Sequence, residues 1–337
     1  MTWLRARPIP ALAGSVVLSA ALAAGSLVGA PSANATCASV FGLGNSADCT
    51  SGLFSVAIAI GPNAKATALA PLSLSLALGG SATSTAEAGM PINGGNLTLA
   101  IGGVAATKGL GNLAVGIGGS AFANGGINAA LTLLPNGGLT SANGYASLAV
   151  LAFSTAGGNV YTSGNLNASV VTLSNGGVAS SKGNGNLAVS ALGSFASAYI
   201  EGNGNLAGVL LSNSGQALAN GNFNNAFTVA VDGAWAQAGS TSQPSTLATA
   251  FNVFSRNSQA LTRGGPFAYA GSILQDGPTI TQTGTGFNIN GFKVGGAAAV
   301  NRTKAGSANA TKATAAKGAA KPSGSVGGSK RKAASGD

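Results

Sequence analysis

The residues that could carry out acid–base chemistry are few and scattered in this sequence. The chain of 337 residues has no His, and its acidic residues are Asp48, Glu87, Glu201, Asp232, Asp276 and Asp337. Enzymes that transfer protons near neutral pH use His or a pair of tuned carboxylates. Clusters of Cys, His and carboxylates with metal-ligand spacing are also missing from the sequence. We therefore expect a protein that is not an enzyme and that uses no metal or cofactor.

The first 35 residues have the pattern of a secretory signal peptide. Arg5 and Arg7 precede an uncharged, Ala-rich stretch at residues 11–30, and residues 33–35 (ANA) supply a small-x-small site. We expect cleavage after Ala35. A retained membrane anchor is the alternative, because a stretch of about 20 apolar residues can span a bilayer. The sequence thus predicts a secreted protein that is extracellular or located in the cell envelope.

Cys37 and Cys49, the two cysteines of the chain, follow directly after the predicted cleavage site. In an oxidising compartment two such cysteines are expected to form one disulfide. A redox function would favour a tighter motif such as CxxC. We therefore interpret the pair as a structural clasp at the N-terminal end of the mature chain.

The most regular feature of the sequence is a phrase of the form Gly-Asn-x-Asn. It begins at Gly164, Gly183, Gly202 and Gly221, at intervals of 19 residues. A fixed period of about 20 residues is typical of solenoids, in which each repeat stacks on the one before. Such a repeat specifies a scaffold and does not by itself identify a ligand.

The same pattern extends towards the N-terminus. An Asn or Ser before a short apolar run recurs at Ser55, Ser73, Asn96, Asn112, Asn128, Ser147, Asn167, Asn186, Asn205 and Asn224. Each unit has two stretches in which small apolar residues alternate, as at residues 186–189 and 215–219. Alternation with a period of two predicts short β-strands. The Gly and Asn residues between the two stretches suit tight turns.

These units predict an all-β fold, a parallel β-solenoid of about ten coils. We expect inward positions to hold mostly Ala, Val, Leu and Ser, which requires a narrow interior. Asn residues aligned in successive coils are expected to form hydrogen-bonded ladders. The predicted organisation is a clasped cap at residues 36–53, coils at 54–240, a second cap or degenerate coils at 241–300, and a tail at 301–337.

Two stretches resemble the coils of trimeric autotransporter adhesin heads. They are FSVAIAIGPNAKATA at residues 54–68 and GNLAVGIGGSAFANG at residues 111–125. Those heads are left-handed parallel β-rolls that trimerise and bind host surfaces. The resemblance covers about residues 54–240 and implies a β-roll with an adhesive function. Most coils in this sequence are longer than those of that family.

The layout of the whole chain resembles a group of uncharacterised secreted proteins of mycobacteria. The shared features are an Ala-rich leader ending in ANATC at residues 33–37, the stretch FGLGNSADC at residues 41–49, and Gly/Ala/Asn coils. This resemblance implies the cell envelope or medium of an actinobacterium. It implies no activity.

The positive charge is concentrated at the C-terminal end. Residues 36–301 carry six bases and five acids, a net charge of +1, whereas residues 302–337 carry eight bases and one acid, a net charge of +7. The eight bases are Arg302, Lys304, Lys312, Lys317, Lys321, Lys330, Arg331 and Lys332. The segment lacks the apolar bulk needed for a core, so we expect it to be disordered.

Two functions fit this basic tail. It would tether the protein to polyanions, such as acidic cell-wall polymers, glycosaminoglycans or anionic lipid headgroups, or it would serve only as a soluble spacer. Nucleic acid would be bound non-specifically, through charge alone. Association into a homo-oligomer stays open at this point.

The sequence therefore favours a structural, adhesin-like protein of the cell envelope or extracellular space, tethered by its basic tail. One alternative is a carbohydrate-active β-helix enzyme, which needs two carboxylates about 5–10 Å apart. The other is a secreted scaffold whose tail is a spacer.

Overall fold

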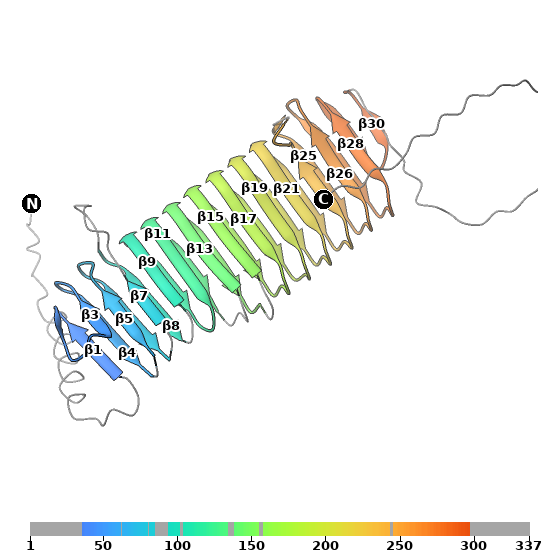
Figure 1. Ribbon diagram of the computed structural model, residues 1–337. Helices are drawn as coiled ribbons and strands as arrows, with labels where there is room; N and C mark the ends of the chain where they lie inside the picture. Colours follow the sequence, from blue (N-terminus) through green and yellow to red (C-terminus); the bar gives the residue numbers. More distant parts are fainter. Residues whose placement is uncertain are drawn as a thin grey trace, which may run out of the picture. The chain divides into compact units, whose positions relative to one another are not determined.

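The described part of the chain is built from β-strands and contains no helix. A computed structural model describes residues 36–61, 63–79, 81–84, 94–101, 104–133, 138–154, 158–242 and 245–296. The chain alternates between two sheets and makes about 11 turns of a β-solenoid (Figure 1). The predicted fold class is therefore confirmed, with one strand of each coil in each sheet.

Sheet A has 16 strands and sheet B has 14. In spatial order, sheet A contains β2 (Leu43–Gly44), β1 (Thr36–Val40), β4 (Val56–Ile60), β6 (Leu74–Leu78), β8 (Leu97–Ile101), β10 (Leu113–Gly116), β12 (Ala129–Thr132), β14 (Leu148–Ala152), β16 (Ala168–Thr172), β18 (Leu187–Ala191), β20 (Leu206–Leu210), β22 (Asn225–Val229), β25 (Thr249–Val253), β27 (Ala268–Ile273), β29 (Gly286–Ile289) and β30 (Phe292–Val294). Sheet B contains β28 (Thr279–Thr283), β26 (Gln259–Arg263), β23 (Trp235–Ala238), β21 (Gln216–Asn222), β19 (Ser197–Asn203), β17 (Val178–Asn184), β15 (Gly158–Asn165), β13 (Gly138–Tyr145), β11 (Ser120–Gly126), β9 (Val104–Leu110), β7 (Ser81–Ser84), β5 (Lys65–Ala68) and β3 (Cys49–Ser51), with β24 (Ser245–Thr246) paired to β21.

Successive coils are stacked in register, so the same position of each coil lies in one row along the solenoid. Leu187 of β18 pairs with Leu206 of β20, and Lys182 of β17 pairs with Glu201 of β19. Both pairs are 19 residues apart in the sequence, which is the length of one coil in this region. Neighbouring strands of a sheet lie about 4.8 Å apart, and this spacing sets the rise per coil.

The Gly-Asn-x-Asn phrase forms the corner at which the chain leaves sheet B for sheet A. Gly202 must lack a side chain, because an added Cβ would lie 1.8 Å from the carbonyl oxygen of Gly221 in the next coil. Asn203 is exposed, and its Oδ1 accepts a hydrogen bond of 2.9 Å from the matching Asn of the preceding coil. Gly204 turns the chain with a φ of 65°. Asn205 then points into the solenoid and is buried.

The buried Asn residues connect neighbouring coils through a ladder of side-chain hydrogen bonds. Asn186 Oδ1 accepts from the backbone N–H of Asn205 at 2.9 Å, and Asn186 Nδ2 donates to the carbonyl oxygen of Gly202 at 2.7 Å. The same pair of bonds is made by the side chains of Asn96, Asn112, Asn128, Asn167, Asn205 and Asn224. The predicted Asn ladder is confirmed.

The interior between the two sheets is narrow and is filled mainly by small side chains. Ala188 of β18 and Ala198 of β19 are fully buried, and Ala recurs at these positions in many coils. Ser169 and Ser181 face each other across the interior, with their hydroxyl oxygens 2.9 Å apart. The expectation that Leu is among the main inward residues is wrong, since Leu151 and Leu261 are the buried Leu residues of the described chain. Leu187, like the first residue of many other sheet A strands, is on the outer face, because the space between the sheets suits Ala and Ser.

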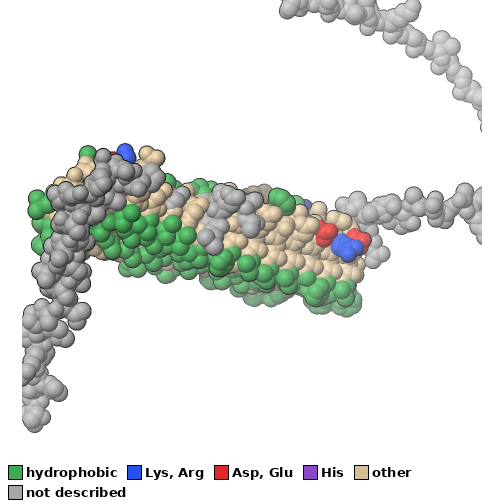
Figure 2. All heavy atoms as spheres, turned by 90° about the horizontal axis from the view of Figure 1, so that it is seen from below, with side chains coloured by type: hydrophobic (Ala, Val, Ile, Leu, Met, Phe, Trp, Pro, Cys, Tyr) green, Lys and Arg blue, Asp and Glu red, His purple; other side chains and the backbone are tan. Residues whose placement is uncertain are grey.

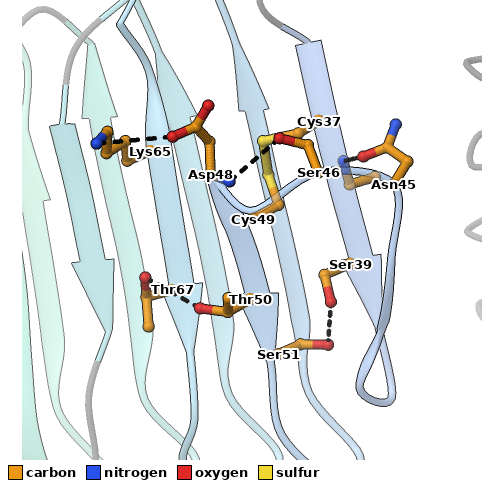
Figure 3. Close-up of a disulfide and its surroundings, with 11 residues drawn as sticks. Cys37, Ser39, Asn45, Ser46, Asp48, Cys49, Thr50, Ser51, Lys65 and Thr67 are labelled. Carbon is orange, nitrogen blue, oxygen red and sulfur yellow. Dashed lines mark hydrogen bonds and ion pairs between the residues drawn. A yellow bond between two sulfur atoms is a disulfide. The ribbon is translucent and has the colours of Figure 1, made fainter.

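The N-terminal end is closed by β1 and by a disulfide. Strand β1 pairs antiparallel with β4, in contrast to the parallel coils that follow. Cys37 of β1 is bonded to Cys49 of β3, so the disulfide joins the first strands of the two sheets (Figure 3). Beside it, Lys65 Nζ lies 3.6 Å from Asp48 Oδ1. The predicted disulfide is therefore present.

The coils continue into the range for which we expect a second cap or degenerate coils. Strands β25 and β27 extend sheet A, and β26 and β28 extend sheet B, all in parallel register. Strand β30 then folds back antiparallel on β29 (Figure 1, orange to red). A hairpin of this kind interrupts the parallel stacking and protects an otherwise open sheet edge.

We predict that Asn205→Ala lowers the free energy of unfolding by about 2–3 kcal/mol, because it leaves a buried backbone N–H and a partly buried carbonyl oxygen without the Asn side chain as partner. Asn203→Ala is the matched control: its partners are exposed and can bond to water, so the expected loss is below about 1 kcal/mol. Urea unfolding followed by circular dichroism measures both. Equal losses in the two variants would contradict the structural importance of the buried ladder.

We also predict that replacing both Cys37 and Cys49 by Ser destabilises the solenoid by about 3 kcal/mol, since the disulfide no longer restricts the unfolded chain. The measurement is the shift in the urea midpoint relative to the oxidised wild type. The reduced wild type should show the same shift as the double Ser variant. A midpoint that does not move in either sample would contradict this prediction.

Candidate functional surfaces

The outer surface of sheet A is apolar along the solenoid. In β8, Leu97, Leu99 and Ile101 point outward, while Thr98 and Ala100 between them are buried. We call the corresponding outward residues the apolar face, and it consists of Val56, Ile58, Ile60, Leu74, Leu76, Leu78, Leu97, Leu99, Ile101, Leu113, Val115, Ala129, Leu131, Leu148, Val150, Ala152, Ala168, Val170, Thr172, Leu187, Val189, Ala191, Leu206, Gly208, Leu210, Asn225, Phe227, Val229, Thr249, Phe251, Val253, Tyr269, Gly271 and Ile273. None of these residues is charged.

Strand register turns these residues into three straight rows. Leu74 pairs with Leu97 and Leu76 with Leu99, so large aliphatic side chains lie side by side in neighbouring coils. Figure 2 shows a band of hydrophobic side chains that runs along one side of the solenoid. A soluble monomer seldom exposes a contiguous apolar patch larger than about 600 Å². A face of this extent is therefore a candidate contact surface.

The outer surface of sheet B has a different character. Its outward rows mix polar and charged side chains with apolar ones such as Phe122, Tyr199 and Leu218. The charged ones include Lys182 and Glu201, whose Nζ and Oε1 atoms lie 3.1 Å apart in adjacent coils. The exposed Asn203 belongs to the same side of the solenoid. The two faces of the solenoid therefore differ in polarity, and the apolar face is restricted to sheet A.

Two further rows of apolar side chains border the apolar face. We call them the first and second corner ladders, and both consist of non-Gly residues in the left-handed region with φ between 48° and 58°. The first precedes the strands of sheet A and contains Phe54, Leu72, Ile127, Ala146, Leu166, Phe223, Leu247 and Phe267. The second follows those strands and contains Phe153, Leu173, Leu192, Leu211, Ala230, Phe254 and Leu274.

The corner ladders are costly for the folded protein in two ways. A left-handed conformation costs a non-Gly residue about 1–2 kcal/mol, and an exposed Leu or Phe gives up the benefit of burial. Yet Leu72 is 74% exposed and Leu166 is 69% exposed. Strained residues of this kind cluster where a structure serves a function. We interpret the ladders as extensions of the contact surface.

A shallow groove follows the second corner ladder. One cavity of about 600 Å³ is lined by Leu173, Leu192 and Leu211 on one side and by Asn175, Ser194 and Asn213 on the other. A second cavity of about 370 Å³ continues it and shares Leu211 and Asn213. The groove is therefore apolar along one wall and rich in amide and hydroxyl groups along the other.

The polar wall of this groove ends in a ladder of alternating charge. Asp232, Arg256 and Asp276 occupy the same position in three consecutive coils, where isolated parallel bridges connect them. Asn213 Nδ2 donates to Asp232 Oδ1 at 3.4 Å. Two strand spacings place Asp232 and Asp276 about 10 Å apart along the backbone. This arrangement was not predicted from the sequence, because the two acids are far apart in it.

The remaining predicted site residues fall outside the described residues. These are the leader with its cleavage after Ala35 and the basic tail from Arg302 to Lys332. Among the described residues, no group of three His, Cys, Asp or Glu side chains could hold a metal ion. No helix that could cross a membrane occurs in the described part of the chain. The structure therefore adds the apolar face, the corner ladders and the groove to the surfaces considered from the sequence.

Comparisons with protein-family models, with curated proteins and with solved structures find no match to this chain. The resemblances described above therefore stay interpretations of the sequence, and a function has to be argued from the surfaces of the solenoid.

We predict that Leu166→Gly stabilises the solenoid by about 1 kcal/mol, because Gly adopts the left-handed conformation without the cost borne by Leu. Gly185 and Gly204 occupy this position in the next two coils with φ near 64°. As a control, Leu187→Gly within β18 should destabilise by about 1 kcal/mol. Thermal unfolding of the two variants measures both effects. A lower midpoint for Leu166→Gly would show instead that packing of the Leu side chain stabilises the solenoid.

Proposed function

We propose that this protein is a non-catalytic structural protein of the cell envelope or extracellular space, adhesin-like in that it acts through extended surfaces. The observation that carries the proposal is the apolar face, which repeats one pattern from β4 to β27 without a charged residue. Catalytic and small-molecule sites are usually concave and combine apolar walls with a few convergent polar groups. An extended row pattern suits contact with another large surface.

A location outside the cytoplasm is supported by two independent features. The leader sequence has the pattern of an export signal, and the buried disulfide between Cys37 and Cys49 fits an oxidising compartment. We propose that the mature protein is secreted and stays extracellular or in the envelope.

The basic tail provides the proposed attachment to polyanions. The tail carries eight bases between residues 302 and 332, and its one acid, Asp337, follows them in the sequence. Each base near an anionic surface contributes about 1 kcal/mol at moderate ionic strength. Acidic cell-wall polymers, glycosaminoglycans and anionic lipid headgroups all supply such a surface. We propose that the tail tethers the solenoid to one of these polymers.

Among the described residues, Asp232 and Asp276 are the acids that the solenoid places in one row, and they are the candidate pair for the enzyme alternative. Carboxylates that hydrolyse glycosides need room between them for the sugar and, in inverting enzymes, for a water molecule. In this row the intervening position is occupied by Arg256, whose permanent charge suits a carboxylate neighbour on each side. We therefore favour a structural interpretation of the charged ladder.

We predict that replacing all eight tail bases by Gln weakens binding of the purified protein to immobilised heparin and to anionic wall polymer by at least about tenfold, which corresponds to about 1.4 kcal/mol. Wild-type binding should fall steeply with salt, because screening shortens the range of the attraction. Retention on the two matrices at several salt concentrations measures both effects.

The control is a variant with the same tail composition in a shuffled order, which should bind as the wild type does because the attraction depends on charge. Unchanged binding of the Gln variant would contradict the tether and support the alternative that the tail is a spacer.

A further inference from the structure

The apolar face is too large to be left in contact with water. Strands about 4.8 Å apart, with about 3.3 Å per residue, give a face roughly 16 Å wide and 60 Å long, or about 960 Å². This exceeds the largest patch of a typical soluble monomer, about 300–600 Å². The hydrophobic effect therefore favours a partner that covers the face.

The face is also flat where its largest side chains lie. A Cβ added to Gly271 would be 2.2 Å from Cζ of Phe251, and one added to Gly208 would be 3.0 Å from Cδ1 of Phe227. The two Phe rings therefore lie over glycines of neighbouring coils instead of standing upright. An aromatic ring that covers a Gly of a neighbouring strand keeps the surface of the sheet even. An even surface is needed for packing against a second sheet.

Charge distribution argues against an anionic lipid surface as the partner of this face. Surfaces that lie on such membranes place Lys and Arg around their apolar side chains. Among the described residues, Lys65, Lys108, Lys182 and Arg263 are in sheet B, and Arg256 lies in a turn between the sheets. Lys293 is in β30, beyond the last strand of the apolar face. A charge-free centre is instead typical of the buried core of a protein–protein interface.

We infer that two copies of this protein pack with their apolar faces against each other. The rows of both copies have the same spacing of about 4.8 Å, so side chains can interdigitate along the whole length. When two copies pack through the same face, the dimer is isologous and closed. It removes roughly 1,900 Å² of surface from water, within the range of about 1,200–2,000 Å² for stable interfaces. This inference rests on the proposed function, because it names a second copy as the large surface that the apolar face contacts, and it is independent of the tail.

The test compares equivalent substitutions on the two faces of the same coils. Val170→Lys with Val189→Lys places two charges in the central row of the apolar face. Ser180→Lys with Tyr199→Lys places them in the central outward row of sheet B, in the same two coils. Light scattering after gel filtration should give a dimer for the purified wild type and the sheet B variant, and a monomer for the apolar-face variant.

Circular dichroism shows whether each variant is folded. If the Lys pair on the apolar face does not fold, Val170→Thr with Val189→Thr replaces it. Thr already occupies the outward positions 172 and 249 of this face, and β-branched residues suit strands. The Thr pair should weaken dimerisation at least about tenfold, as measured by the dilution at which the dimer dissociates, because the lost methyl groups no longer bury apolar area.

Several results would overturn the inference. The wild type could stay monomeric in the micromolar range or form an assembly larger than a dimer. The dimer could also persist in the variant with the Lys pair on the apolar face, or the sheet B variant could dissociate as much as the apolar-face variant does. Binding of a monomeric wild type to phosphatidylcholine or phosphatidylglycerol vesicles, lost in the apolar-face variant, would instead assign the face to lipid. The tail variant with eight Gln residues should dimerise normally, which separates this inference from the proposed tether.

Discussion

The structure depends on the hydrogen bonds made by the buried corner Asn. Each such Asn, for example Asn186, connects its coil to the backbone of the next at two points, Asn205 N–H and the Gly202 carbonyl. Because the N–H is buried and the carbonyl oxygen is partly buried, a shift of one residue would leave them unpaired at a substantial cost. The Asn ladder therefore sets the register, and the register decides which side chain of each strand faces outward.

The narrow interior is the second constraint, and it follows from this register. Ala188 and Ala198 are both fully buried between the two sheets, so the distance between the sheets suits small side chains. Larger residues are consequently placed on the outer surface of sheet A and at its corners. A usual soluble sheet buries its larger apolar face, whereas this solenoid buries mainly Ala and Ser, with some Val such as Val171 and Val209, and displays most of its Leu. Its contact surface is thus a direct result of how tightly it is wound.

Much of the architecture could be predicted from particular residues. The 19-residue spacing of the Gly-Asn-x-Asn phrase predicted the solenoid, and the recurring Asn predicted the ladder. The position of Cys37 and Cys49 after the leader predicted the clasp. The charged ladder of Asp232, Arg256 and Asp276 was missed, because the coils around it differ in length and the acids are far apart in the sequence. An alignment of coils beyond Asn224, through Ala248 and Ala268, is the signal that would have found it.

The sequence by itself determined that the chain forms short strands, that they repeat at intervals of 16 to 23 residues, and that the net positive charge is concentrated in the tail. It did not determine which set of alternating residues lies inside, because Ala and Ser alternate with Leu and Val, and both sets contain apolar residues. Only the tertiary structure decided this. Two sheets joined through corners as tight as that of Gly204 and Asn205 leave room between them for the smaller set, so the larger set becomes the surface.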